Sequence, residues 1–397
     1  MTAPSFSKLA DVASINPKLA NRPADDELIS FIPMSSVDAE AGTTESGAER
    51  TFGEVSKGYT IFSDKDVLVA KITPCFENGK IAQAGLRHRI GVGSTEFHVI
   101  RPNRFELDAR YLLHFLRRPA VRVAGERRMT GSAGQRRVPE AFLADLSIPT
   151  PPLPEQKRIA EVLDRVDELR AKRREALAHL DDLTQSIFLD LFGSPSSNPM
   201  DWPLVTLGDA LAMPLRNGLS PATRGQVEGL VLTLSSVTGQ RFDPTARKRA
   251  TFLAPPPAAQ TVHPSDFLIC RGNGNLSLVG RGFFPYDPMP DTTFPDTVIA
   301  ARIQTTTVRP VFLEHVWRSN AVRRQIEALA RTTNGTYKVN QTMLESVSFF
   351  APPLPLQDDF VRKIAAVDVL RQRHSSHHAE LDALFASLQD RAFRGLL

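Results

Sequence analysis

Cysteine and long apolar runs are almost absent from this sequence of 397 residues. Cys75 and Cys270 are its only cysteines, too few for the disulfide framework of a small secreted domain, so we expect a reducing compartment. No stretch of about 18 apolar residues occurs, which argues against a membrane-spanning helix. The segment Met1–Ala10 also lacks the apolar core of a signal peptide. These absences predict a soluble cytoplasmic protein.

The motifs of several enzyme classes are missing as well. The sequence holds no CxxC pair, no HExxH, no GxSxG and no Asp/Asn-Pro-Pro-aromatic motif of amino methylation. Gly53–Thr60 has the glycine spacing of a phosphate-binding loop, but Tyr59 stands where lysine is required. We therefore predict no catalytic residue, no metal ligand and no cofactor bound by this chain.

Two short segments leave an alternative open. His374 and His378 have the i, i+4 spacing of a metal-binding pair, with His377 beside them. The other interpretation is a polar break in a helix. Gly272–Asn275 suits either a phosphate cradle or a turn after a strand that ends at Cys270. In both cases we favour the structural interpretation.

The sequence contains an internal repeat, in which residues near one position recur about 200 positions later. The matching segments are Phe31–Val37 with Val231–Val237, Asp66–Val69 with Asp266–Ile269, and Pro151–Pro154 with Pro352–Pro355. A unit of this length is a whole domain with its connector rather than a solenoid repeat. Two similar bodies on one chain suit a pseudo-twofold partner such as duplex DNA.

The repeat divides the chain into four segments, 1–150, 151–196, 197–351 and 352–397. The first and third contain short β-type runs separated by Gly, Pro and Asn. Each ends in a helix-like stretch, Ala109–Arg128 or Val311–Arg331. We therefore predict two mixed α/β domains. Their predicted strands are Phe31–Val37, Asp66–Ile72, Glu96–Ile100, Leu230–Val237, Asp266–Cys270 and Asp296–Ile303.

The second and fourth segments are predicted to be single long helices, Glu155–Gly193 and Leu356–Arg394. Apolar residues recur in both at i, i+3, i+4 and i+7, and the first helix would reach roughly 58 Å. We expect the two apolar stripes to pack together as an intramolecular coiled coil. Docking of each helix onto its own globular domain is the alternative. Arg170–Arg174 and Arg371–His374 are polar, so we expect a looser seam at the centre.

Positive charge recurs at the same place in both repeats. Residues 1–150 carry 20 lysines and arginines against 18 acidic residues, and residues 194–351 carry 15 against 11. In each, a basic helix precedes a small polar loop, and such amides, hydroxyls and guanidinium groups suit phosphate oxygens. A solvated basic helix face is the alternative. We predict phosphate contacts from Arg117, Arg118, Arg122, Arg127, Arg128, Thr130, Ser132, Arg136, Arg137, Arg318, Arg323, Arg324, Arg331, Thr333, Thr336 and Lys338.

A family resemblance enters at the start of the first long helix. Pro151-Pro152-Leu153-Pro154-Glu155-Gln156, followed by a long amphipathic helix, resembles the specificity subunits of type I restriction–modification enzymes. Trp202-Pro203-Leu204-Val205-Thr206-Leu207-Gly208-Asp209 resembles the opening of a target-recognition domain in that family. The resemblance covers essentially the whole chain. Leu356 and Asp358 depart from the helix-start motif in the second copy, and the opening Phe6–Val12 lacks the tryptophan.

This resemblance implies an α+β fold with two tandem α/β target-recognition domains joined by two long antiparallel helices. It implies that each domain reads one half of a split double-stranded DNA target and that the helices set the gap. It further implies two modification (methyltransferase) subunits and a restriction (motor–nuclease) subunit as partners. S-adenosylmethionine, ATP and magnesium would bind those partners rather than this chain.

Base-reading is expected from loops that follow early strands, because Arg and Lys pair with guanine and Asn pairs with adenine. The candidates are Lys71, Thr73, Asn78, Lys80, Arg271, Asn273 and Asn275. Solvated loop side chains are the alternative. Two other functions stay open: a nuclease or methyltransferase with an unrecognised site, and a coiled-coil scaffold that binds only protein.

Overall fold

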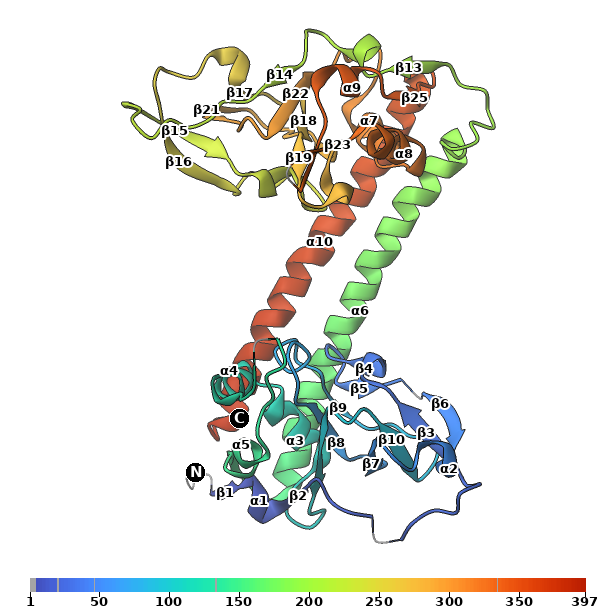
Figure 1. Ribbon diagram of the computed structural model, residues 1–397, viewed down its shortest axis with the longest axis vertical. Helices are drawn as coiled ribbons and strands as arrows, with labels where there is room; N and C mark the ends of the chain where they lie inside the picture. Colours follow the sequence, from blue (N-terminus) through green and yellow to red (C-terminus); the bar gives the residue numbers. More distant parts are fainter. Residues whose placement is uncertain (1–4, 20, 46, 133, 334) are drawn as a thin grey trace. The chain divides into compact units, whose positions relative to one another are not determined.

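The computed structural model describes residues 5–19, 21–45, 47–132, 134–333 and 335–397. The chain forms two compact units, Met1–Leu177 with Arg373–Leu397, and Ala178–Gln372. Each unit combines one globular domain with parts of two long helices (Figure 1). The boundary between the units therefore runs through the helices rather than at either end of them.

Two sheets build the globular domain of the first unit. The larger contains, in order across the sheet, β2 (Ala13–Ile15), β11 (Phe97–Pro102), β8 (Val67–Ala70), β9 (Ile81–Gln83), β5 (Thr43–Thr44) and β4 (Val37–Asp38). The smaller contains β6 (Ala48–Thr51), β3 (Leu28–Ile32), β10 (Ile90–Gly93) and β7 (Thr60–Ser63). A separate pair joins β1 (Phe6–Lys8) to β12 (Ser147–Pro149). All four residues of β8 are buried, because Val67 and Val69 pack in one core cluster and Leu68 packs in another.

The second unit repeats this plan. One sheet contains β16 (Arg247–Phe252), β15 (Val227–Leu232), β21 (Met289–Thr293) and β17 (Thr261–Val262). Another contains β14 (Arg216–Asn217), β22 (Val298–Arg302), β18 (Asp266–Cys270) and β20 (Gly282–Phe283). The remaining pairings are β19 (Gly272–Asn273) with β24 (Thr336–Lys338) and β23 (Arg331–Thr333), and β13 (Leu204–Thr206) with β25 (Ser348–Phe350). As β3 pairs parallel to β10 and antiparallel to β6, so β15 pairs parallel to β21 and antiparallel to β16.

Each predicted strand overlaps an observed one, but only one of the six has the predicted bounds. Asp266–Cys270 has the predicted bounds as β18. The strand predicted at Phe31–Val37 ends at Ile32, because Pro33 has no N–H for the ladder. The strand predicted at Leu230–Val237 ends at Leu232. Short 3-10 helices follow both: η1 (Met34–Ser36) and η3 (Leu234–Val237), with η2 (Gly208–Ala210), η4 (Ala258–Gln260) and η5 (Leu276–Leu278) elsewhere.

Each predicted basic helix is in fact two helices. The first stretch divides into α3 (Ala109–Leu116) and α4 (Pro119–Arg128), and the second into α7 (Pro310–Trp317) and α8 (Asn320–Leu329). Pro119 occupies the first position of α4, where its missing N–H costs nothing. Ser319 caps α8 by accepting from the Val322 amide. The shorter helices are α1 (Leu9–Val12), α2 (Phe52–Val55), α5 (Glu140–Ala144) and α9 (Gln341–Glu345).

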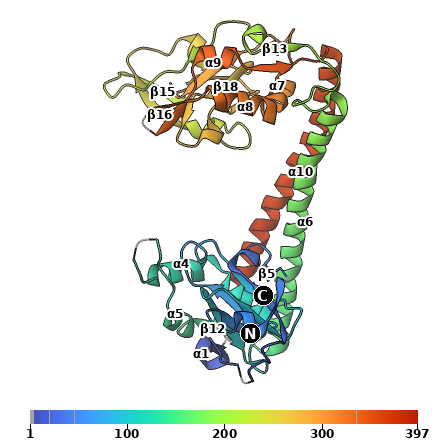
Figure 2. The same cartoon turned by 45° about the vertical axis from the view of Figure 1, so that its right-hand side comes forward.

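The two predicted long helices are confirmed as α6 (Leu153–Phe192) and α10 (Leu354–Phe393), each of 40 residues (Figure 2). Helix α6 ends where Gly193 adopts a left-handed φ of 75°, the conformation of a glycine helix stop. A Cβ at this position would approach Pro199 to 2.4 Å. The backbone conformation and the lack of room for a Cβ therefore both favour glycine at the predicted end of this helix.

The helix ends are buried in globular cores, as the alternative interpretation predicted. In the first unit, Ile159 and Leu163 of α6 and Phe393 of α10 belong to the domain core. In the second unit, Phe188 of α6 and Phe360 of α10 pack with 5.5 Å between their ring centroids inside the other core. Apolar contact between the two helices is thus seen at Phe188 and Phe360, inside the core of the second unit. Nearer the centre, four leucines are 42–46% exposed: Leu169, Leu183, Leu370 and Leu384.

Polar contacts join the helices near their centres. In the first unit, Arg170 Nε donates to Asp382 Oδ1 at 2.6 Å, and Arg173 Nη1 lies 3.0 Å from His374 Nδ1. In the second unit, Arg371 Nη2 donates to Asp181 Oδ1 at 2.8 Å. Polar side chains thus lie at the centre of both helices, and His374 is among them; the looser seam predicted there stays a prediction.

A half-buried carboxylate fastens α3 to α6 in the first unit. Asp164 accepts from His114 Nε2 at 2.7 Å and from both Nε and Nη2 of Arg110. Burial disfavours the charge on Asp164, but the hydrogen bonds from His114 and Arg110 outweigh it and lower its pKa to about 2. The ionised carboxylate is therefore stabilised by the folded state.

We expect Asp164→Asn to lower the free energy of unfolding by about 1–2 kcal/mol at pH 7, a value reduced for solvent screening because the side chain is 35% exposed. A lowered pKa contributes stability above about pH 4, and this contribution is lost as pH falls toward 2. Denaturation followed by circular dichroism at several pH values measures it. Glu161→Gln, an exposed change on the same helix, should alter stability by less than about 0.5 kcal/mol. Equal acid sensitivity of wild type and Asp164→Asn would contradict the assignment.

Candidate nucleic-acid interface

In both units, the segment after a central strand pairs with the polar loop that follows the basic helices. In the first unit, the Val138 amide donates to Lys71 O at 2.8 Å and the Thr73 amide donates to Arg136 O at 3.0 Å. In the second, the Val339 amide donates to Arg271 O at 2.9 Å. We call residues 71–80 with 130–138 the first loop pair, and residues 271–275 with 331–338 the second loop pair.

The loop pairs bring predicted base-reading and phosphate-binding residues together. Gly272 pairs with Lys338, and Asn273 with Tyr337, between β19 and β24. Ile72 bridges to Arg137 at the equivalent place of the first unit. The sequence separation is more than 60 residues in each case, so only the fold creates this neighbourhood. Each half of the chain thus has a surface that is formed by the extension of one strand and by the polar loop beside it.

Several predicted phosphate-binding residues are exposed at this surface. In the first unit they are Arg127, Arg128, Thr130 and Ser132, and in the second they are Arg324, Arg331 and Lys338. Arg136 and Thr336 are half-buried. The side chain of Thr333 lies outside the described residues. These side chains are placed where a polyanion has access to them.

Other predicted phosphate-binding residues are held by groups within the protein. Arg117 is 11% exposed, pairs with Asp167 Oδ2 at 3.0 Å and also donates to the Ala39 and Glu40 carbonyls. Its burial lowers the pKa of the guanidinium despite the Asp167 charge. Arg137 makes a bidentate pair with Glu96, which holds the pKa of Glu96 below its usual value. The cations of Arg118 and Arg318 lie over the rings of Phe393 and Phe283, at 5.2 and 4.8 Å.

Arg122 and Arg323 brace a turn in their own domain. Arg323 Nη1 donates to Val279 O at 2.6 Å, and its Nη2 donates to Leu276 O at 3.2 Å. Arg122 Nη1 lies 3.5 Å from Glu77 O and beside Gly79, which like Gly280 has a left-handed φ. The recurrence of this arginine therefore has a cause inside the protein. Direct phosphate contact by either residue stays a prediction.

The predicted base-reading side chains divide in the same way. Lys80 Nζ donates to Met34 O at 2.7 Å, and Thr73 Oγ1 donates to Glu77 Oε1 at 2.9 Å, so both are engaged internally. Arg271 Nη1 donates to Asp296 O at 3.2 Å. Asn78 is exposed, and Lys71 is half-buried.

The segment Gly272–Asn275 is a short strand followed by a turn, as favoured from the sequence. Asn273 Oδ1 accepts from the Asn275 amide at 2.9 Å. Asn275 Oδ1 accepts from the Ser277 amide at 3.0 Å and so caps η5. The side-chain oxygens brace the backbone, whereas the side-chain amide nitrogens stay the groups that would meet a base edge.

Sequence reasoning missed a cationic strand in the second unit. Arg247, Lys248 and Arg249 open β16, and all three side chains are exposed. We call these three residues the cationic strand. Three consecutive basic residues mark this strand in the sequence, but they have no counterpart in the first repeat, and only charges that recur in both repeats indicated DNA. The equivalent strand β6 carries Glu49 and Arg50 instead.

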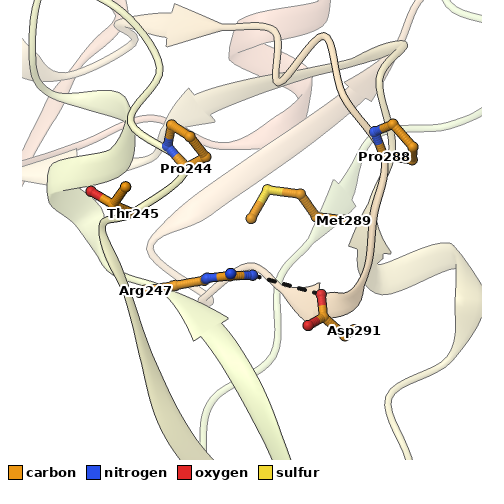
Figure 3. A pocket seen from close by; sticks show the side chains of 6 residues that line it. All are labelled: Pro244, Thr245, Arg247, Pro288, Met289 and Asp291. Atoms are coloured by element: carbon orange, nitrogen blue, oxygen red, sulfur yellow. Dashed lines mark ion pairs between the residues drawn. The ribbon is translucent and has the colours of Figure 1, made fainter.

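A hollow of about 610 Å³ lies beside the cationic strand. Its lining consists of Pro244, Thr245, Arg247, Pro288, Met289 and Asp291. Figure 3 shows the Arg247 guanidinium reaching across toward Asp291, at 3.7 Å. Arg247 Nη1 also donates to Thr292 Oγ1 at 3.2 Å. Arg247 is therefore tied to β21, whereas Lys248 and Arg249 project from the exposed strand.

The described residues hold no group of three or more His, Cys, Asp or Glu side chains that could ligate a metal. Burial raises the pKa of the Cys270 thiol to about 11, so it is protonated at neutral pH. None of the helices in the described ranges is long and apolar enough to cross a membrane.

Residues 5–179 match the type I restriction modification DNA specificity domain. The chain is therefore similar to this family over its first globular domain and part of α6. It is 38% identical over 197 residues to the EcoEI specificity subunit of Escherichia coli, covering 48% of this chain and 33% of that protein. It is 41% identical over 181 residues to the EcoAI specificity subunit of Escherichia coli, covering 44% and 30%. The chain thus spans about a third of the length of these two relatives.

Longer matches to this family extend into the second repeat. The StySPI specificity subunit of Salmonella potsdam is 27% identical over 318 residues, covering 75% of this chain and 67% of that protein. Among solved structures, the type I restriction-modification system S subunit from M. genitalium has a TM-score of 0.57 at 14% identity, covering 98% and 96%. A structure describing complex assembly of the type I R-M system also reaches 0.57, at 20% identity, covering 100% and 99%. These two show a shared fold.

Proposed function

We propose that this chain is the DNA-recognition subunit of a type I restriction–modification complex, in which each globular domain reads one half of a split target. The observation that carries the proposal is the loop pair, which recurs in both units with the same backbone pairing. A strand extension beside a polar loop offers both base-directed and phosphate-directed groups on one surface. The match of residues 5–179 to the type I restriction modification DNA specificity domain supports the same function.

In this proposal, α6 and α10 form an antiparallel coiled-coil spacer that gives the chain a pseudo-twofold plan. Its support is the order of the contacts, in which Arg170 meets Asp382 and Asp181 meets Arg371. Two modification subunits and a motor–nuclease subunit would dock on the chain. The chain would act in the cytoplasm without catalysis of its own. S-adenosylmethionine, ATP and magnesium would bind its partners.

The exposed cations and the exposed amide groups would have different roles in binding DNA. Arg127, Arg128, Arg331 and Lys338 would fix each domain on phosphates, so their removal should weaken binding to all sequences. Asn78 and the amide groups of the second loop pair would meet base edges. Because the side chains at the two loop pairs differ, the two half-sites would differ as well.

Co-expression with the modification subunits of the same system tests the function. We expect methylated adenines at one two-part motif, with two defined half-sites separated by a gap of constant length. Sequencing that detects modified bases in the host genome measures the motif. The chain without partners should shift random duplex at low salt, because phosphate contacts do not need a defined sequence.

Two outcomes would contradict the proposal, each favouring another function. Cleavage or methylation of DNA by the purified chain alone, with magnesium and S-adenosylmethionine, would indicate an enzyme. Binding of the modification subunits without any shift of duplex DNA would indicate a protein-only scaffold.

A further inference from the structure

Two buried glutamines occupy the same place in both repeats. Gln156 and Gln357 are each 0% exposed, and each is the sixth residue of a Pro-Pro-Leu-Pro-x-Gln segment that opens a long helix. Buried side-chain amides are costly unless their hydrogen-bonding groups are satisfied. Their retention at both positions therefore needs a physical cause.

The first glutamine ties the start of α6 to the start of α3. Gln156 Oε1 accepts from the Asp108 amide at 2.9 Å. Its Nε2 donates to Glu106 O and to Pro151 O, each at 2.8 Å. Asp108 is the N-cap of α3, the helix that leads into the basic α4. Both N–H donors and the oxygen of this amide are thus used at the joint between the domain and the helix that leaves it.

The second glutamine makes the equivalent joint. Gln357 Oε1 accepts from the Arg309 amide at 2.8 Å, and its Nε2 donates to Pro352 O at 2.7 Å. Arg309 is the N-cap of α7. Each amide therefore links the helix start, the preceding proline segment and the cap of the domain helix.

The surrounding charged contacts differ between the joints, whereas the amide contact does not. In the first unit, Asp164 binds Arg110 two turns along α6. In the second, Asp358 binds Arg309 with both oxygens, at 2.6 and 3.0 Å, directly beside the glutamine. Hydrogen bonds are directional, so the three at Gln156 and the two at Gln357 add to apolar packing in fixing the rotation of each helix.

Building on the function proposed above, we infer that Gln156 and Gln357 are positioning residues for spacing selectivity. Each fixes the direction in which a long helix leaves its recognition domain, and together they restrict the gap between half-sites that the complex accepts. Neither residue contacts DNA in this scheme. A helix that starts with more freedom would let its domain reach half-sites at neighbouring gap lengths.

The test uses the complete complex with its modification subunits and the genome-wide methylation map. Gln156→Met and Gln357→Met keep the length of the side chain and remove its hydrogen bonds. We expect unchanged half-site sequences, but methylation at gaps one base pair longer and shorter. The preference for the native gap should fall about tenfold, because only part of the free energy of the three hydrogen bonds lost at Gln156 and the two lost at Gln357 would distinguish one gap from another.

Gln325→Met is the matched control. This glutamine bonds the Ser348 amide and carbonyl within the second domain and contacts neither long helix through its amide. We expect it to reduce the amount of folded complex without changing the gap. If Gln156→Met and Gln357→Met behave like this control, with fewer methylated sites but the native gap alone, the inference is wrong.

A second pair of variants keeps the test decisive if the methionine variants do not fold. Gln156→Glu and Gln357→Glu keep an acceptor for the Asp108 and Arg309 amides and lose the donor to the proline carbonyls, so we expect an intermediate gap distribution. A native gap distribution in these variants would overturn the inference. Absence of any two-part motif in the wild-type complex would instead overturn the proposed function.

Discussion

Replacing Lys248 and Arg249 together with glutamate is expected to weaken binding of random duplex DNA about 30-fold at 0.15 M salt. Each phosphate contact contributes roughly 0.9 to the slope of log K against log salt, so the loss of two contacts should reduce the slope by about 1.8. Both side chains are exposed on β16, and neither residue belongs to a buried core. Titration of fluorescent duplex at several salt concentrations gives affinity and slope together.

The matched control reverses the same amount of charge elsewhere in the second unit. Arg362 and Lys363 are exposed on α10 and pair only with Asp359 of the same helix among the ion pairs of the described chain. Arg362→Glu with Lys363→Glu should leave the slope within about 0.5 of wild type, because contact rather than net charge sets it. Equal slopes for both double variants would show that the cationic strand has no specific part in binding.

Phe188→Ala is expected to lower the free energy of unfolding of the second unit by about 3–5 kcal/mol. Phe188 is 2% exposed, and its ring lies 5.1 to 6.2 Å from four other phenylalanine rings: Phe192, Phe312, Phe350 and Phe360. Removing it leaves a cavity where α6, α10 and the domain core meet. Urea denaturation measures the loss.

Tryptophan fluorescence makes this measurement specific. The sequence has two tryptophans, Trp202 and Trp317, and both lie in the second unit. Leu189→Ala, next to Phe188 but 41% exposed, should cost less than about 1 kcal/mol. A midpoint for Phe188→Ala equal to that of Leu189→Ala would show that the aromatic cluster does not stabilise the unit.

The long helices and the central strands were predictable because their signals are local. Apolar residues at helical spacing, with a proline before and Gly193 after, determine α6 within two residues. The run at Asp266–Cys270 is apolar and bounded by turns, and it forms β18 with those bounds. The division between α3 and α4 had a local signal too, since Pro119 favours a helix start.

The partners of the arginines were not predictable, because they depend on tertiary placement. Arg117 meets Asp167, which lies 50 residues away, and Arg323 meets two backbone carbonyls that leave no trace in the sequence. The sequence of a basic helix does not show whether its guanidinium groups face solvent or the protein. For this reason the recurrence of Arg122 and Arg323 suggested DNA, whereas the structure shows a braced turn. The loop pairs likewise needed the fold to bring them together.

Phe393 and Ala392 belong to the core of the first domain, and Phe385 and Leu388 pack against it. The first globular domain is thus closed by residues of α10, which follow the whole second domain in the sequence. During synthesis it must wait for more than 200 further residues, including the whole second domain, before its apolar interior is sealed. The core of the second domain needs no residues beyond α10. It is therefore completed before the core of the first domain, although the first domain is translated earlier.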